Sequence, residues 1–382
     1  MSSIQNKTIA IIGGGPGGLT LARLLQMRGA HVKVYERDTH RTVRVQGATL
    51  DLHYESGLKA LEAAGLMPAF EANYRPGADL MVITDKTGKV LLRDEESRTG
   101  EDARPEIDRG PLRDILLDSL HPGTVVWDSQ FSSMEQTDGK WTITFKNETV
   151  AEADIVVGAD GANSKVRPCL TPIQPFFVGM TVVEGAVYDA AQKAPRVNQL
   201  LNGGKIFTLG DSHTLIVSSK GDGSIAFYVG FKSEADWATA SGIDFTKPHE
   251  VAEWFKREFK GWGDIWLELF DNAEPKLIPR PQYCMPLDQD WPAQDNLTLL
   301  GDAAHLMPPY AGEGVNMAML DALELADSLT NADFTDTQSA IAHYEANMRK
   351  RASETADITL QQTEVMHSPD GLEQMLAFFG GA

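Results

Sequence analysis

The sequence contains only two cysteines, Cys169 and Cys284, among its 382 residues. Neither belongs to a Cys-x-x-Cys pair or a Cys/His cluster, so we expect no disulfide framework and no metal site, and a reducing cytoplasm fits this composition. Basic residues are also scarce, because 34 lysines and arginines oppose 54 aspartates and glutamates, which gives a net charge of −20. A surface of this charge repels nucleic acids and anionic membranes, so neither is an expected partner.

Long apolar runs are missing as well. The first apolar segment, Thr8–Ile12, ends at a glycine and is too short for a membrane span or a signal peptide. Internal repeats and low-complexity tracts are absent from the sequence. The length suits two domains or one domain with an insertion, so we expect a globular, cytoplasmic and monomeric protein.

A glycine-rich turn lies between two strand-like segments, Thr8–Ile12 and Val32–Tyr35, and opens a helical pattern over 16–28. This order matches one βαβ unit. The glycines have G-x-G-x-x-G spacing, in which the first forms a tight turn, the second admits a pyrophosphate and the third lets helix and strand pack. The residues concerned are Gly13, Gly15 and Gly18, with Pro16 at the start of the helix. The segment therefore predicts a dinucleotide site at the N-terminus of this helix.

The end of the second strand-like segment carries two further candidates. Glu36 is placed to accept hydrogen bonds from ribose hydroxyls. Arg37 is either a contact of the adenosine or an ordinary surface arginine. These features alone do not separate FAD from NAD.

Two later segments distinguish FAD from NAD as the expected cofactor. Asp160-Gly161, within Ala159–Arg167, and Gly301-Asp302 resemble the two further fingerprints of the class A flavoprotein monooxygenases, the para-hydroxybenzoate hydroxylase family. This resemblance implies FAD as cofactor and NADPH or NADH as its reductant. It also implies that Asp302 lies near the flavin ribose and pyrophosphate, and that the segment of Asp160 helps to bind both cofactors.

Three longer stretches, Gly47–His53, Pro105–Arg113 and Gly301–Asn316, resemble the tetracycline-inactivating flavin monooxygenases in particular. The positions matching these relatives imply FAD contacts for Asp51, Arg109 and Asp302, and an NADPH contact for Arg44.

The resemblance also implies an α/β fold. We expect a Rossmann-like FAD-binding domain of the para-hydroxybenzoate hydroxylase (GR2) type from 1–77, 100–171 and 276–328. An inserted, mainly antiparallel β-sheet substrate domain is expected from 78–99 and 172–275, followed by a C-terminal helical segment from 329–382.

In this family the nicotinamide cofactor reduces the flavin, O₂ adds to form a C4a-hydroperoxyflavin, and one oxygen atom passes to the substrate. The chain's own part is to exclude water and to stabilise charge at one edge of the flavin. We expect a stiff loop and a helix N-terminus to do this. The residues concerned are Pro308, Gly312, Gly314 and Val315, followed by Asn316 as a cofactor contact. The alternative is a stiff loop before a helix that does not touch flavin.

The sequence shows no Ser-His-Asp set and no paired-carboxylate site. His305 is either a base or a buried histidine bonded to nearby groups. The aromatic residues between 254 and 266 are interpreted as helix packing, with a substrate cage as the alternative.

The predicted substrate pocket differs from that of the tetracycline-inactivating relatives. Where they have a glutamine, an arginine, a histidine and a glycine, this chain has Glu184, Lys205, Ala226 and Tyr228. Donors that fix a tetracycline are thus missing and Tyr228 fills an open space, so we expect a polycyclic or aromatic substrate, with tetracycline as a poor substrate or none. The alternative is an aromatic-compound hydroxylase of secondary metabolism or catabolism with no tetracycline activity. The remaining pocket residues are Phe207, Pro309 and Met366.

Three other readings of the sequence stay open. A flavin halogenase would carry Trp-x-Trp-x-Ile-Pro, which Trp262–Trp266 does not match. A prenyl-chain reductase would need a membrane-facing surface. A non-catalytic binder on a flavoprotein-like scaffold would not need the segment Asp302–Asn316.

Overall fold

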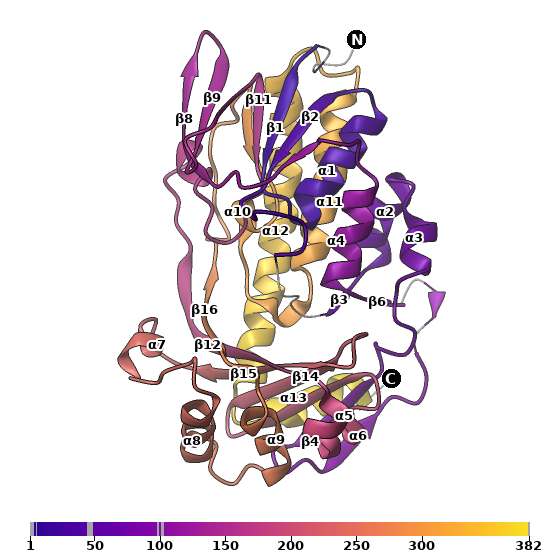
Figure 1. Cartoon of the computed structure of the whole chain (residues 1–382), viewed down its shortest axis with the longest axis vertical. Helices are drawn as coiled ribbons and strands as arrows, with labels where there is room; N and C mark the ends of the chain where they lie inside the picture. The colour runs from indigo at the N-terminus through magenta and orange to yellow at the C-terminus, as the bar shows by residue number, and fades with distance from the viewer. Residues whose placement is uncertain (1–3, 5, 44–48, 98, 101–102, 381–382) are drawn as a thin grey trace.

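The structure is a computed structural model and describes residues 4, 6–43, 49–97, 99–100 and 103–380 (Figure 1). A five-stranded parallel sheet forms its upper half, with the strand order β17-β11-β1-β2-β7. The strands are β1 (Thr8–Ile12), β2 (His31–Tyr35), β7 (Val125–Val126), β11 (Ile155–Gly158) and β17 (Leu297–Leu299). The residues of β1, β11 and β17 are nearly all apolar and buried, as expected for strands covered on both faces, whereas β2 alternates exposed and buried residues and β7 is half-buried.

The order of these strands explains why the three fingerprint segments meet. β17, β11 and β1 are neighbours and run parallel, so their carboxyl ends lie at one edge of the sheet. The glycine turn follows β1, Asp160 follows β11, and Gly301 follows β17. Ligands of open α/β sheets bind at this edge. The predicted α/β fold is confirmed.

Smaller elements surround this sheet. A three-stranded antiparallel sheet contains β8 (Phe131–Thr137), β9 (Lys140–Phe145) and β10 (Val150–Ala153), and β3 (Thr49–Asp51) pairs with β6 (Glu106–Asp108). The helices of this half are α1 (Pro16–Met27), α2 (Lys59–Ala63), α3 (Met67–Glu71), α4 (Arg109–Asp118), α10 (Asp302–His305) and α11 (Gly314–Thr330). Residues Tyr54–Leu58 form the π-helix η1, whose wider turn leads directly into α2.

The lower half is a seven-stranded sheet with the order β16-β12-β15-β14-β13-β4-β5. Its strands are β4 (Met81–Asp85), β5 (Val90–Arg93), β12 (Phe176–Val187), β13 (Lys205–Gly210), β14 (His213–Ser219), β15 (Ile225–Lys232) and β16 (Ile278–Cys284). All pairings are antiparallel except that of β13 with β4. β16 lies in this sheet, although the expected boundary at residue 276 gives its residues to the cofactor domain.

Helices cover the lower face of this sheet (Figure 1). They are α5 (Ala190–Lys193), α6 (Pro195–Leu201), α7 (Trp237–Ala240), α8 (Pro248–Glu258) and α9 (Leu267–Asp271), with the 3₁₀ turn η4 (Asp264–Trp266). The aromatic side chains of α8 and α9 pack with the sheet in one buried cluster, in agreement with the helix-packing interpretation.

The C-terminal region links the two halves. α12 (Thr337–Met366) begins at the side-chain cap of Asp336 and contains 30 residues, which makes it about 45 Å long. It runs from the parallel sheet to the seven-stranded sheet, where α13 (Gly371–Gly380) packs on β13 and β5 (Figure 1). None of the described helices is long and apolar enough to cross a membrane.

Candidate cofactor and substrate site

The glycine turn has the shape that a pyrophosphate site requires. A Cβ on Gly13 would lie 2.2 Å from Ala159 O, and one on Gly18 would lie 2.2 Å from Gly13 O, so both positions are filled by backbone. A Cβ on Gly15 would meet no described atom within 4 Å. Gly15 is also the N-cap of α1, whose helix starts at Pro16. Close packing on two sides and open space at the helix N-terminus fit a dinucleotide phosphate.

Glu36 is buried and shapes this turn. Its Oε2 accepts a hydrogen bond from Gly14 N at 2.6 Å and its Oε1 accepts one from Asp38 N at 3.0 Å. A carboxylate has further lone pairs, so the ribose contact stays a prediction. Arg37 is exposed beside it. Arg44 lies outside the described residues.

Asp160 organises the second fingerprint segment. Its carboxylate accepts hydrogen bonds from Ser164 Oγ at 2.5 Å, Lys165 N at 2.6 Å and Val166 N at 3.2 Å. These bonds hold the turn that leads to the 3₁₀ helix η3 (Arg167–Cys169). The carboxylate itself is thus directed into its own turn, and its predicted cofactor contact is untested.

Arg167 joins the second fingerprint segment to the third. Its buried guanidinium donates to Ala303 O at 2.9 Å, Ala304 O at 2.7 Å and Gln289 Oε1 at 2.7 Å, and its Nε donates to Ile173 O at 3.0 Å. Burial lowers the pKa of Arg167 to about 10, which leaves the group charged at neutral pH. Arg167 is the last residue of the predicted motif Ala159–Arg167, and the sequence alone indicates no role for it.

Asp321 anchors the third segment from behind. Its Oδ2 accepts from Gly301 N at 2.9 Å and lies 2.5 Å from His305 Nε2, while Arg351 donates to its Oδ1 at 2.7 Å. His305 is buried in this ion pair, so its geometry agrees with a buried histidine and not with a base in the pocket. Burial raises the pKa of Asp302, against the opposing charges of His305 and Arg109.

The loop before α11 brings predicted flavin contacts together. A Cβ on Gly312, whose φ is +70°, would lie 3.2 Å from Asp51 Oδ2, and one on Gly314 would lie 3.9 Å from Asp302 Oδ1. Two predicted FAD-binding carboxylates therefore flank the residues that open α11. Pro308 is buried and Pro309 starts the 3₁₀ turn η5 (Pro309–Ala311).

The side chain of Asn316 makes its hydrogen bonds within the protein. Its Oδ1 accepts from His53 N at 2.9 Å, and its Nδ2 donates to Asp51 O at 2.9 Å and to Gly312 O at 3.4 Å. The buried side chain thus holds the end of β3 against the α11 loop. This geometry gives the Asn316 side chain a scaffolding role, and the contact of this residue with the cofactor stays a prediction. Val315 is half-buried in the first turn of α11.

The predicted substrate residues lie on one face of the seven-stranded sheet. Glu184 is opposite Tyr228, Tyr228 is opposite Ile216, and Ile216 is opposite Phe207. Residues directly opposite in a sheet point to the same side, so this is one continuous row. A second row on the same face contains Lys205, Ser218 and Ala226, which are opposite one another on β13, β14 and β15. Each lies two residues from a member of the first row. Met366 packs in the same cluster as Phe207 and Tyr310.

The charged members of this row are paired within the protein. Lys205 Nζ forms an ion pair with the buried Glu106, and Glu184 Oε2 lies 2.6 Å from Arg280 Nε. Burial raises the pKa of Glu106 to about 7, although Lys205 opposes this. The hydroxyl of Tyr228 is buried and has no partner among the described residues. Arg109, exposed at the start of α4, is close enough that its charge acts on both Tyr228 and Asp302.

Tyr310 and His367 join the C-terminal helix to this sheet. His367 Nε2 lies 3.3 Å from Tyr310 Oη and 3.1 Å from Thr214 Oγ1, and its Nδ1 donates to Thr363 O at 2.8 Å. The ring is fully buried. Burial lowers the pKa of His367 to about 4. The sequence gave no signal for this contact, because its partners are far apart in the chain.

His367 makes a specific prediction for stability in acid. The unfolded histidine binds a proton near pH 6.5, which the folded ring does not take until about pH 4. The native state is therefore expected to lose about 2 kcal/mol of unfolding free energy through this group between pH 7 and pH 5. Urea unfolding of the wild type and of His367→Gln at both pH values measures this loss of unfolding free energy. If the difference in unfolding free energy between the two proteins did not change with pH, the assignment to His367 would be contradicted.

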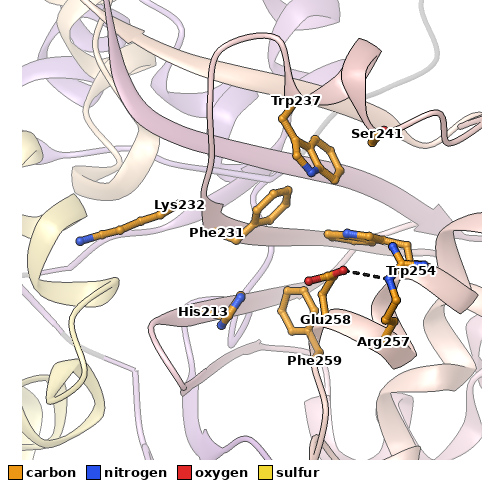
Figure 2. A pocket seen from close by; sticks show the side chains of 9 residues that line it. All are labelled: His213, Phe231, Lys232, Trp237, Ser241, Trp254, Arg257, Glu258 and Phe259. Carbon is orange, nitrogen blue, oxygen red and sulfur yellow. Dashed lines mark hydrogen bonds and ion pairs between the residues drawn. The ribbon is translucent and has the colours of Figure 1, made fainter.

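Two cavities lie away from these residues. One of 260 Å³, shown in Figure 2, has aromatic walls from Phe231, Trp237, Trp254 and Phe259 and lies on the helix-covered side of the sheet. The other, of 600 Å³, lies between the start of α4 and the β14–β15 turn and includes Asp108 and Gly221. Neither is lined by the predicted pocket residues. Among the described residues no group of three or more histidines, cysteines, aspartates or glutamates is arranged to hold a metal ion.

Comparison with known proteins agrees with this geometry. Residues 6–254 and 289–359 match the protein-family model described as "FAD binding domain". Monooxygenase penA of Penicillium thymicola is 28% identical over 98% of this chain and 99% of its own length. The 3-amino-4-hydroxybenzoate 2-monooxygenase PtmB3 of Streptomyces platensis is 30% identical over 98% of this chain and 93% of its own. The crystal structure of tetracycline destructase Tet(55) shares the fold, with a TM-score of 0.76 and 19% identity over 98% of this chain and 95% of that chain.

Proposed function

The chain belongs to the FAD-binding class A flavoprotein monooxygenases, and from this premise we propose that it uses NADPH or NADH to hydroxylate an aromatic or polycyclic molecule other than tetracycline. That it is an FAD-dependent monooxygenase follows from the family match and the named relatives. The reductant, the substrate class and the residues that carry the reaction are our proposals.

The placement of FAD is supported by the edge where three fingerprint segments meet. Gly15 leaves room for the pyrophosphate at the N-terminus of α1, and Asp51 and Asp302 flank the loop that opens α11. We assign Gly13, Gly15, Gly18, Glu36, Asp51, Arg109 and Asp302 to this site. Once reduced, FAD supplies the activation of O₂ and the transfer of one oxygen atom. The N–H groups of Gly314 and Val315 are placed to stabilise negative charge at the flavin edge.

The substrate proposal is carried by the row formed by Glu184, Tyr228 and Phe207. Phe207 lies in this row and supplies an aromatic ring, for which we propose contact with the ring of the substrate. The unpartnered Tyr228 hydroxyl can bond a substrate oxygen or nitrogen, since leaving a buried hydroxyl without a partner costs about 1–3 kcal/mol. The name of the Streptomyces relative, which acts on an aminohydroxybenzoate, supports a substituted aromatic ring.

The pocket does not match the donors expected for a tetracycline. Lys205 is held by Glu106, and Glu184 is held by Arg280. Tyr228 occupies the position at which the tetracycline-inactivating relatives have a glycine. We therefore propose that tetracyclines are poor substrates. We also propose a cytoplasmic monomer, which the two free cysteines and the acidic composition support.

The test follows NADPH oxidation under air with tetracycline, anhydrotetracycline and a panel of phenols, aminobenzoates and fused-ring aromatics. We expect no stimulation by tetracyclines, and stimulation by at least one aromatic compound whose product is heavier by one oxygen atom. Tetracycline turnover would contradict the substrate proposal. Bound FAD without consumption of either NADPH or NADH under any condition would instead favour a non-catalytic binder.

A Tyr228 variant tests whether this residue contacts the substrate. For a substrate with a ring hydroxyl or keto group, Tyr228→Phe is expected to lower kcat/KM by about tenfold, because one buried hydrogen bond is lost. The same substitution should leave FAD binding unchanged. Equal kcat/KM values for both proteins would remove Tyr228 from the substrate site.

A further inference from the structure

A buried histidine lies directly beside the proposed flavin loop. His53 follows β3 and its ring is 1% exposed. Its Nε2 lies 3.1 Å from Asp51 Oδ2, and its Nδ1 lies 3.1 Å from Glu313 Oε1. The guanidinium of Arg104 also contacts Nε2 and, because a guanidinium only donates hydrogen bonds, it competes with Asp51 for this nitrogen. Two carboxylates and one cation, from three separate segments, therefore face one imidazole.

The two carboxylates belong to opposite sides of the proposed cofactor loop. Asp51 Oδ2 lies beside Gly312, where a Cβ would be 3.2 Å away. Glu313 is the N-cap residue of α11 and immediately precedes Gly314. A ring that binds both carboxylates thus connects the end of β3 to the N-terminus of α11. Beyond Asp51, the pair of Lys205 and Glu106 adds one cation and one anion to the same region.

The main chain at His53 does not depend on the ring. His53 N donates to Asn316 Oδ1 at 2.9 Å, and His53 O accepts from Ser56 N at 3.2 Å and Leu58 N at 3.0 Å. These bonds fix the backbone and start the π-helix η1. The ring's contribution is therefore its charge, its Nε2 contact with Asp51 and the ion-pair contact of Nδ1 with Glu313, and a neutral side chain of similar size can replace its volume.

The charge balance favours a protonated ring. Burial and the Arg104 cation oppose the imidazolium, whereas the hydrogen bonds to Asp51 and Glu313 raise the pKa of His53 to about 9. When the ring loses its proton, Asp51 and Glu313 lose their shared cation. Two unneutralised carboxylates next to Gly312 then repel each other and repel an anionic cofactor.

We propose that protonated His53 is the positioning residue that holds Asp51 and the 312–314 loop in the geometry that binds FAD. This inference rests on the proposed placement of FAD at that loop. It predicts that FAD affinity depends on the ring's charge: affinity is full while the ring is protonated and is lost as pH rises and the ring releases its proton.

The experiment titrates the apoprotein with FAD and follows flavin fluorescence at pH 7 and pH 10. Wild type is expected to show a Kd that rises about tenfold between these pH values, equivalent to about 1.4 kcal/mol. His53→Gln keeps one hydrogen bond but cannot carry charge. Its Kd at pH 7 should already be about tenfold above wild type and should change little at pH 10.

His249→Gln, an exposed histidine on α8, is the matched control and should titrate like wild type. The inference is overturned if His53→Gln has the wild-type Kd at pH 7, or if it shows the wild-type rise at pH 10. If His53→Gln does not fold, Glu313→Gln serves instead, because removing one carboxylate should move the loss of affinity to lower pH. An unchanged midpoint would overturn the inference. A wild-type protein that binds no FAD at any pH would instead refute the proposed cofactor site itself.

Discussion

Replacing Gly15 with alanine is expected to leave the folded protein intact and to weaken FAD binding by about a hundredfold. The backbone at Gly15 has φ −79° and ψ 176°, which alanine adopts without strain. Its Cβ would meet no described protein atom within 4 Å, so the apoprotein has no reason to change. The methyl group would instead occupy the space into which the pyrophosphate must fit, and phosphate bonds to backbone N–H groups are worth about 1.5–3 kcal/mol each.

Gly18→Ala is the matched comparison. It adds the same methyl group three residues later, but there the Cβ would lie 2.2 Å from Gly13 O and 3.2 Å from Ile11 Cγ2. We expect this variant to lose folding stability before any cofactor is added. Thermal unfolding of both apoproteins, together with FAD titration of Gly15→Ala, separates the two effects. If Gly15→Ala bound FAD as tightly as wild type, the cofactor would lie elsewhere.

Arg167→Met is expected to destabilise the protein by about 4 kcal/mol, which makes it the largest folding effect of a single side chain in this site. The substitution leaves Ala303 O and Ile173 O without the Arg167 donor and Gln289 Oε1 without its partner, while Ala304 O keeps the hydrogen bond from Gln289 Nε2 at 3.0 Å. Each buried acceptor left unsatisfied costs about 1–3 kcal/mol, and the methionine recovers part of the packing. Because Arg167 ties the Asp160 segment to the Asp302 segment, FAD affinity should fall as well.

Arg28→Met provides the control, because Arg28 is also an arginine in an ion pair but lies at the surface. Its partner Asp327 is 59% exposed, and such a pair contributes at most about 1 kcal/mol. Urea unfolding of wild type, Arg28→Met and Arg167→Met gives the comparison. A loss of under about 1 kcal/mol for Arg167→Met would mean that water replaces the guanidinium.

Local patterns in the sequence predicted the cofactor half well. The strand, glycine turn and helix of residues 8–27 are adjacent in the chain, and their hydrophobic pattern and glycine spacing follow from short-range geometry. The roles of Asp160 and Asp302 came from a family resemblance, and the parallel order of β1, β11 and β17 explains why they belong together. The row of Glu184, Tyr228 and Phe207 was predicted as a pocket, and the sheet register places these residues on one face.

Contacts between residues far apart in the chain could not be predicted from the sequence. His53 has no predicted role of its own, and only the fold brings Glu313, 260 positions away, to its ring. Asn316 is a predicted cofactor contact, and only the fold shows that its side chain also bonds to the backbone of residues 51 and 53. Lys205 was predicted as a pocket cation, and the structure pairs it with Glu106.

The sequence by itself determined that this is a dinucleotide-binding α/β protein of the flavin monooxygenase type, because glycine spacing, strand pattern and fingerprint segments are local features. The tertiary structure decided which charges are neutralised and which polar groups remain free to act. Glu106 and Lys205, and His53 with Asp51 and Glu313, are paired across elements that only folding brings together. The charge of a buried group depends on such partners and on its distance from water, and neither can be predicted from the sequence alone.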